Sequence, residues 1–202
     1  MNSKYAFKWR HYQPEVILLC VRWYLRYPLS YRHVEEMMRE RGLSVDHSTV
    51  YRWVQRYAPE LEKRCRPQLK PTNDSWRVDE TYIKVKGKWK YLYRAVDSSG
   101  NTIDFMLSAK RDKQAAKRFF RKALKAVHNS SPRVINVDKN AAYPPAVDEL
   151  KAAEILAQSG ELRQNKYFNN IMEQDHRFIK KLVNPSLGFK SFHTALKDNY
   201  WL

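Results

Sequence analysis

Apolar residues recur with helical spacing before residue 60, which predicts a helical N-terminal region. Pro14 can open the first helix and Pro28 must end it, because proline fits the first helical turn but cannot continue a helix. The apolar face predicted for this first helix holds four residues, Val16, Leu19, Trp23 and Tyr27.

Two more helices are predicted to follow the first. Ser30 can cap the second helix and Gly42 can stop it. The third helix is predicted to begin at about Asp46 or Ser48 and to end before Pro59. The residues expected to face inward from these two helices are Val34, Met37 and Met38, and then Val50, Trp53 and Val54.

The hydrophobic period changes to two after residue 72, which predicts a second, sheet-containing domain. The predicted elements are strands over 76–85, 89–96 and 102–107, a helix over 112–127 with Val127 on its apolar face, a strand over 134–137, and helices over 146–157 and 169–182. This order predicts an α/β fold, a small mixed sheet flanked by helices. Because the stretch from Pro59 to Ser75 is rich in proline and turn-forming residues, we place the boundary near residue 72 and expect domains over 1–72 and 73–202.

The net charge narrows the choice of partner. The 202 residues include 38 Lys and Arg against 21 Asp and Glu, a formal charge of +17, which favours a polyanion such as nucleic acid. No apolar run reaches the roughly 18 residues that a membrane span needs, and residues 16–21 are too short for a signal peptide. We therefore expect a cytoplasmic protein associated with the nucleoid.

The three predicted helices are typical of a helix-turn-helix, whose last helix reads the major groove of DNA. Arginine matches guanine and glutamine matches adenine through two hydrogen bonds each. The alternative is a basic helical hairpin that packs on another protein. The residues predicted to contact DNA from the third helix are Ser48, Thr49, Arg52, Gln55 and Arg56.

Three acidic residues of the second half stand where carboxylates are unusual. Asp79 interrupts an apolar strand, Asp138 ends a buried strand, and Glu173 lies near the start of the last predicted helix. If the three carboxylates converge, their mutual repulsion requires a divalent cation between them. Mg²⁺ prefers oxygen ligands and phosphates, and two ions together can promote phosphodiester chemistry.

Each acidic residue also has a plain structural interpretation. Asp79 can pair with a lysine of a neighbouring strand, Asp138 can cap the next helix, and Glu173 can belong to a solvated helix face. On that same helix, Arg177 and Lys180 follow Glu173 by about one and two turns, so they are predicted to hold the DNA backbone. Two cysteines are too few for a zinc site or a disulfide framework, so any metal must be held by oxygen.

Five segments of the chain resemble the DDE transposases of bacterial insertion sequences, of the insertion sequence six type, which share a ribonuclease H-like core with retroviral integrases. These segments are residues 45–55, 76–82, 91–97, 136–139 and 167–176. The resemblance implies that Asp79, Asp138 and Glu173 form the catalytic triad and hold two Mg²⁺ ions, for which Mn²⁺ can substitute. It also places a basic residue at Lys180.

The resemblance further implies the reaction and the partners. The protein would bind the terminal inverted repeats through its N-terminal helices, hydrolyse DNA at the element ends, and let the freed 3′ hydroxyls attack target DNA, as a homo-oligomer in a synaptic complex. Strand alternation turns Glu80 away from Asp79, so Glu80 is left out of the predicted site, as are Asp97 and Asp175. His176 is predicted to have a structural role, because neutral histidine is a poor Mg²⁺ ligand.

The chain departs from the family after Lys197, where a further helical segment is expected and five residues follow instead. This predicts a truncated copy that has lost a closing helix. Two alternatives therefore stay open beside an active enzyme: an inert remnant that still binds DNA, and a helix-turn-helix regulator without catalysis.

Overall fold

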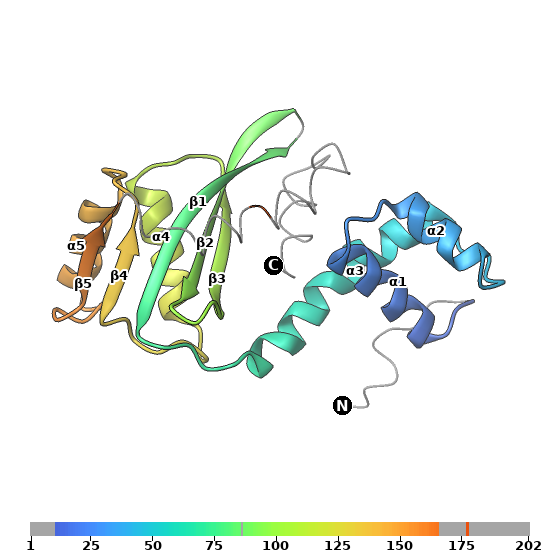
Figure 1. Cartoon of the computed structure of the whole chain (residues 1–202), viewed down its shortest axis with the longest axis horizontal. Helices are drawn as coiled ribbons and strands as arrows, with labels where there is room; N and C mark the ends of the chain where they lie inside the picture. The colour runs from blue at the N-terminus through green and yellow to red at the C-terminus, as the bar shows by residue number, and fades with distance from the viewer. Residues whose placement is uncertain (1–10, 86, 166–176, 178–202) are drawn as a thin grey trace. The chain divides into compact units, whose positions relative to one another are not determined.

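The computed structural model describes residues 11–85, 87–165 and 177 (Figure 1). These residues fall into two units that separate between Arg66 and Pro67. Each unit has its own buried hydrophobic cluster and is described by itself.

The N-terminal unit is helical, with helices α1 (Pro14–Arg26), α2 (Tyr31–Arg39) and α3 (His47–Cys65), followed by a short 3₁₀ turn (Arg66–Gln68). The predicted starts of the three helices are confirmed. Pro14 opens α1, and Ser30 caps α2 by accepting a hydrogen bond from the His33 backbone N–H at 3.1 Å. Asp46 caps α3 through the Ser48 backbone N–H at 2.8 Å. Such side-chain caps satisfy N–H groups that have no partner within the helix.

The core of this unit contains the predicted residues of α2 and α3 except Met37, which is only partly buried and lies outside the core, and α1 turns a different face inward. Val34, Met38, Val50, Trp53 and Val54 are fully buried, as expected. In α1 the buried residues are Ile17, Cys20, Val21 and Leu25, whereas Val16, Leu19 and Trp23 are only partly buried and Tyr27 is exposed. The prediction was wrong because apolar residues surround much of α1, so periodicity alone could not select one face.

The third helix continues through Pro59, which the sequence analysis took as its end. Tyr57 and Ala58 just before this proline are buried in the core. Two ion pairs at (i, i+4) spacing support the last turns, Arg64 with Glu60 at 2.7 Å and Arg66 with Glu62 at 2.9 Å. A proline inside a helix costs about 3 kcal/mol. Core packing before Pro59 and the ion pairs after it offset this cost, so the helix continues.

The second unit contains one five-stranded sheet in the order β3-β2-β1-β4-β5 (Figure 1). Its strands are β1 (Ser75–Val85), β2 (Lys88–Asp97), β3 (Thr102–Ser108), β4 (Val134–Val137) and β5 (Glu161–Gln164). The first three form the predicted antiparallel meander, and β4 and β5 join it in parallel pairing. Glycines in the left-handed region make both meander turns, with φ of +73° at Gly87 and +83° at Gly100.

Helices α4 (Lys113–Leu124) and α5 (Tyr143–Ala152) pack on one face of this sheet. Their apolar residues share one core with Trp76 and Val78 of β1 and Tyr93 and Ala95 of β2. The register pairs Val78 with Ala95, so these side chains share the face that the helices cover. We call it the helix-covered face.

These elements confirm the predicted α/β fold, a mixed sheet with helices packed on it, which follows an all-helical N-terminal region in the chain. Helix α4 ends at Leu124, before the predicted end at 127, so Val127 is fully exposed rather than packed. Helix α5 begins and ends earlier than predicted. The helix predicted over 169–182 lies outside the described residues, apart from Arg177. Among the residues that are described, no helix has the length and apolar character that crossing a membrane requires.

Candidate functional site

Asp79 lies in the middle of β1, on the face of the sheet opposite the helix-covered face. Alternation along the strand places it between the inward-facing Val78 and Glu80, and the register sets it beside Arg94 of β2. One carboxylate oxygen accepts a hydrogen bond from the Glu80 backbone N–H at 2.9 Å. Burial raises the pKa of Asp79 from 3.8 to about 7, and the neighbouring charges of Glu80 and Asp138 add to this rise. The position therefore holds a largely buried carboxylate whose ionised form is disfavoured by its surroundings.

Asp138 directly follows β4, which ends at Val137. Its Oδ1 accepts a hydrogen bond from the Asn140 backbone N–H at 3.0 Å, and its Oδ2 accepts one from Arg111 Nη2 at 2.9 Å. Burial is again the main cause that raises the pKa of Asp138. Since 30% of the side chain remains exposed, this carboxylate is fixed in orientation but still reachable.

The carboxylates of Asp79, Glu80 and Asp138 converge. Each offers an oxygen, and these oxygens all lie within 4.8 Å of one another. The structure thus brings together Asp79 and Asp138, two of the three acidic residues singled out in the sequence. Glu173 and Lys180 lie outside the described residues.

Glu80, which the predicted site does not include, lies in the same cluster of carboxylates. Its side chain does point away from that of Asp79, onto the helix-covered face, yet its carboxylate reaches the same cluster. The side chain is 1% exposed. It accepts hydrogen bonds from Arg111 Nε, from Asn140 Nδ2 at 2.9 Å and from the buried Tyr143 hydroxyl.

A signal for Glu80 was present in the pattern of β1. Trp76, Val78 and Glu80 alternate onto the buried face, and a buried carboxylate requires partners. Those partners come from the segment before α4 and from the start of α5, which the sequence could not place beside β1. Arg111 connects the cluster, because its guanidinium binds Glu80 through Nε and Asp138 through Nη2.

The donor set of this cluster suits a hard divalent cation. All three groups offer carboxylate oxygens, the ligand type that Mg²⁺ and Mn²⁺ prefer. Within the cluster, Glu80 accepts hydrogen bonds from the protein at both of its carboxylate oxygens. The surroundings of Asp79, in contrast, disfavour its ionised form and raise its pKa. A cation bound there would favour ionised Asp79 and offset the repulsion between the carboxylates. The residues present therefore fit a metal held by Asp79 and Asp138.

The residues predicted to contact DNA lie on α3 with the expected exposure. Arg52 and Arg56 are exposed, and Ser48, Thr49 and Gln55 are partly exposed. Tyr51, which the sequence analysis did not include, is 43% exposed on the same helix and forms an edge contact with Tyr31 at 5.5 Å between ring centroids. In the second unit, Arg177 is exposed.

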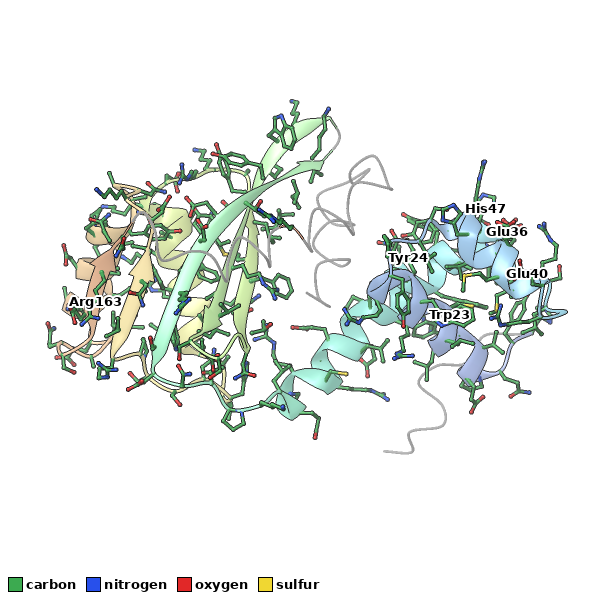
Figure 2. The ribbon with its side chains drawn as sticks, in the orientation of Figure 1. Trp23, Tyr24, Glu36, Glu40, His47 and Arg163 are labelled. Carbon is green, nitrogen blue, oxygen red and sulfur yellow. The ribbon has the colours of Figure 1, made fainter. Side chains whose placement is uncertain are left out.

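A second cluster of possible metal ligands lies in the helical unit, where Glu35, Asp46 and His47 also place ligand atoms within 4.8 Å of one another. Figure 2 shows His47 at the start of α3. His47 Nδ1 is 3.0 Å from Glu35, and Arg39 lies 3.3 Å from the other oxygen of Glu35. Hydrogen bonds from Ser48 lower the pKa of Asp46. This cluster is therefore stabilised by its own neighbours.

The comparison with known sequences gives strong matches. A family profile described as a DDE domain matches residues 73–198. The transposase for insertion sequence-like element IS431mec of Staphylococcus aureus is 43% identical over 174 residues, which cover 86% of this chain and 76% of that protein. The transposase for insertion sequence element IS257 in transposon Tn4003, also of Staphylococcus aureus, is 42% identical over the same shares of both chains.

Among solved structures, similarity extends to viral integrases. The catalytic core domain of HTLV-2 integrase, solved in complex with magnesium in a trimeric form, is 20% identical with a TM-score of 0.46, over 58% of this chain and 73% of that one. A chain of the simian T-cell lymphotropic virus intasome, in complex with PP2A regulatory subunit B56 gamma, is 14% identical with a TM-score of 0.49, over 76% of this chain and 57% of that one.

Proposed function

This chain belongs to the DDE transposases of insertion sequences, and we propose that it cuts DNA at the ends of its element and joins the freed 3′ ends to target DNA with the help of divalent metal ions. The convergence of Asp79 and Asp138 carries this proposal. These residues come from separate strands, yet their carboxylate oxygens lie within 4.8 Å on a protein whose formal charge is +17.

Asp79 and Asp138 would hold the metal, and Glu173 would complete the ligand set, as the family resemblance implies. When bound, two Mg²⁺ ions would activate the attacking oxygen and stabilise the leaving oxygen of a phosphodiester. Mn²⁺ would substitute, since it takes the same oxygen ligands. Ionised Asp79 is required to bind a cation, so the raised pKa predicts that protons compete with metal below about pH 7.

Arg111 and Asn140 would keep Asp138 in the orientation that metal binding needs. The two oxygens of Asp138 are held separately, one by the Asn140 backbone N–H and the other by the Arg111 guanidinium. Glu80 in turn accepts hydrogen bonds from both Arg111 and the Asn140 side chain. We assign Glu80 to this support rather than to the metal, because Tyr143 occupies its second oxygen.

DNA would be recognised through α3 and held near the carboxylates by basic residues. Arg52 and Arg56 would contact base edges in the major groove of the terminal inverted repeats, with Ser48, Thr49 and Gln55 beside them. Arg177 and Lys180 would bind phosphates beside the metals. Two ends must be held together for strand transfer, so a homo-oligomeric synaptic complex is part of the proposal.

A cleavage and strand-transfer assay tests the enzyme. The substrate is a duplex that carries the DNA flanking the coding region, with Mg²⁺ or Mn²⁺ added. We expect cutting by the native protein, and none above background for Asp79→Asn or Asp138→Asn. Asp148→Asn is the matched control, because Asp148 is an exposed aspartate on α5 of the same unit. Binding without cutting by the native protein would instead support an inert remnant or a regulator.

Footprinting on the same duplex tests DNA reading separately. Arg52→Ala should weaken specific binding by about 1 to 3 kcal/mol. Arg22→Ala, which removes an exposed arginine of α1, is the control of equal charge. A footprint that both variants leave unchanged would contradict the assignment of α3 as the reading helix.

A further inference from the structure

The hairpin formed by β1 and β2 extends beyond the other strands of the sheet (Figure 1). Strand β4 pairs with β1 only from Ser75 to Arg77, and the pairing of β2 with β3 stops at Tyr91 with Ser108. The outer part of the hairpin therefore continues past its neighbours on both sides.

The two faces of this projecting segment differ sharply. On one face, Ile83 and Val85 are buried, with 2% and 3% of their surfaces exposed. On the other face, Tyr82 is 46% and Trp89 is 63% exposed, and Lys84 is exposed as well. Single exposed aromatic side chains are common, but a contiguous group of them is typical of a binding surface.

The three exposed side chains and the partly buried Tyr91 form a continuous strip across the two strands. The register pairs Tyr82 with Tyr91, and their ring centroids are 5.2 Å apart. It also pairs Lys84 with Trp89, with the lysine nitrogen 5.8 Å from the centre of the indole ring. We call these four residues, Tyr82, Lys84, Trp89 and Tyr91, the hairpin strip.

The hairpin strip begins two residues after Glu80, the member of the acidic cluster that points onto the helix-covered face. Tyr82 and Lys84 follow Glu80 at intervals of two residues on the same face of β1. Because each pair of residues spans about 6.6 Å along a strand, the strip leads outward from Glu80 for roughly 13 Å. Successive phosphates of a fully extended nucleic-acid strand are about 6 to 7 Å apart, so this length matches two or three nucleotides.

The charge of the hairpin favours nucleic acid over a second copy of the chain. The segment from Tyr82 to Tyr91 holds four lysines and no acidic residue. Two such segments would repel each other, whereas phosphates would be attracted. Aromatic rings interleaved with cations are the features with which proteins bind single strands.

We propose that the hairpin strip binds unpaired nucleotides at the DNA end adjacent to the acidic cluster, with Trp89 and Tyr82 stacking on bases and Lys84 contacting a phosphate. The bases of a duplex already stack on one another, so only unpaired bases can offer their faces to these rings. This inference rests on the proposed function in that DNA is taken as the ligand.

Fluorescence anisotropy with labelled DNA tests the proposal without metal or catalysis. One probe is a duplex with a five-nucleotide single-stranded end, and the other is the fully paired duplex of the same sequence, both in EDTA. Trp89→Ala should weaken binding of the first probe about ten-fold, because base stacking on one aromatic ring is worth that much, and should change binding of the second by less than about two-fold.

Three further variants sharpen the test. Trp89→Phe keeps an aromatic face and should restore most of the affinity. Tyr27→Ala is the matched control, since Tyr27 is 46% exposed, as is Tyr82, but lies in the helical unit. Lys84→Gln should reduce the slope of log affinity against log salt for the single-stranded probe by about 0.7. Thermal unfolding of each variant checks that the fold is kept.

Several results would overturn the proposal. Equal losses on both probes would mean that the strip binds duplex backbone only. Unchanged affinities together with a change in oligomeric state for Trp89→Ala would mean that the strip joins copies of the chain. If the hairpin variants bind both probes normally while Asp79→Asn still abolishes cutting, the role of the hairpin strip is refuted and the proposed function stands. If Trp89→Ala weakens binding of the single-stranded probe but the native protein does not cut DNA, the role of the strip is supported and the proposed function is refuted.

Discussion

The described residues of this chain include two clusters of potential metal ligands, one in each unit, and the surroundings of their charged groups differ. Asp79, Glu80 and Asp138 in the sheet unit, and Glu35, Asp46 and His47 in the helical unit, both bring ligand atoms within 4.8 Å. In the helical unit, Asp46 caps α3. In the sheet unit, burial and like charges raise the pKa of Asp79 to about 7.

The comparison shows that proximity of ligand atoms is not sufficient to indicate a metal site. In the helical cluster a histidine contacts both carboxylates and an arginine lies beside one of them. The sheet cluster holds three carboxylates with Arg111 as the cation that binds two of them. An added cation lowers the free energy of the second cluster far more than that of the first.

Metal binding should separate the two clusters most strongly. Titration of the native protein with Mn²⁺ at pH 7.5 should release or absorb heat in a calorimeter, and Asp79→Asn or Asp138→Asn should weaken that binding at least about ten-fold, because each removes a charged ligand. His47→Ala should leave the titration unchanged. Loss of binding in His47→Ala alone would assign the metal to the helical unit.

Stability should also depend more on the sheet cluster. Glu80→Gln replaces a buried carboxylate that Arg111, Asn140 and Tyr143 bind, and we expect the free energy of unfolding to fall by about 2 to 4 kcal/mol. Glu35→Gln, at a partly exposed position, should change it by less than about 1 kcal/mol. Urea unfolding of both variants measures the contrast, and equal losses would contradict it.

The pH dependence of stability should have an unusual sign in the sheet unit. Folded Asp79 keeps its proton up to about pH 7, whereas the unfolded chain releases it near pH 3.8. Between these values the folded state binds more protons, so this residue makes stability fall as pH rises, by at most about 1.4 kcal/mol for each pH unit. Asp79→Asn should remove that fall in stability. Urea unfolding of the native protein and of the variant, from pH 4 to 8 in EDTA, measures the difference between their free energies of unfolding at each pH. A parallel pH dependence in the two proteins would show that the pKa of Asp79 is not raised.

The smallest effect should come from the helical cluster and have the opposite sign. Because the folded pKa of Asp46 is lowered, its stabilising contribution is present above pH 3.8 and is lost as pH falls below that value. Asp46→Asn keeps a capping oxygen, so its thermal unfolding should differ only slightly from that of the native protein at pH 7. A loss larger than that of Glu80→Gln would reverse the order of the two clusters.

Local signals in the sequence predicted most of the elements correctly. Pro14, Ser30 and Asp46 mark helix starts through chemistry that acts within one turn, and the change of period after residue 72 marks the sheet. These signals failed where packing opposed them: α1 buries a face that periodicity could not select, and α3 continues through Pro59.

The sequence by itself determined that Asp79 and Asp138 are exceptional, because a charge in an apolar strand and one at the end of a buried strand are costly without a purpose. Only the tertiary structure decided that Glu80 joins them. Strand alternation turns the Glu80 side chain away from that of Asp79. Alternation gives only the direction of each side chain along one strand, and it does not predict which residues pack on each face of the sheet. Arg111, Asn140 and Tyr143 come from distant segments, and their contacts with Glu80 and Asp138 arise only once α4 and α5 cover the sheet.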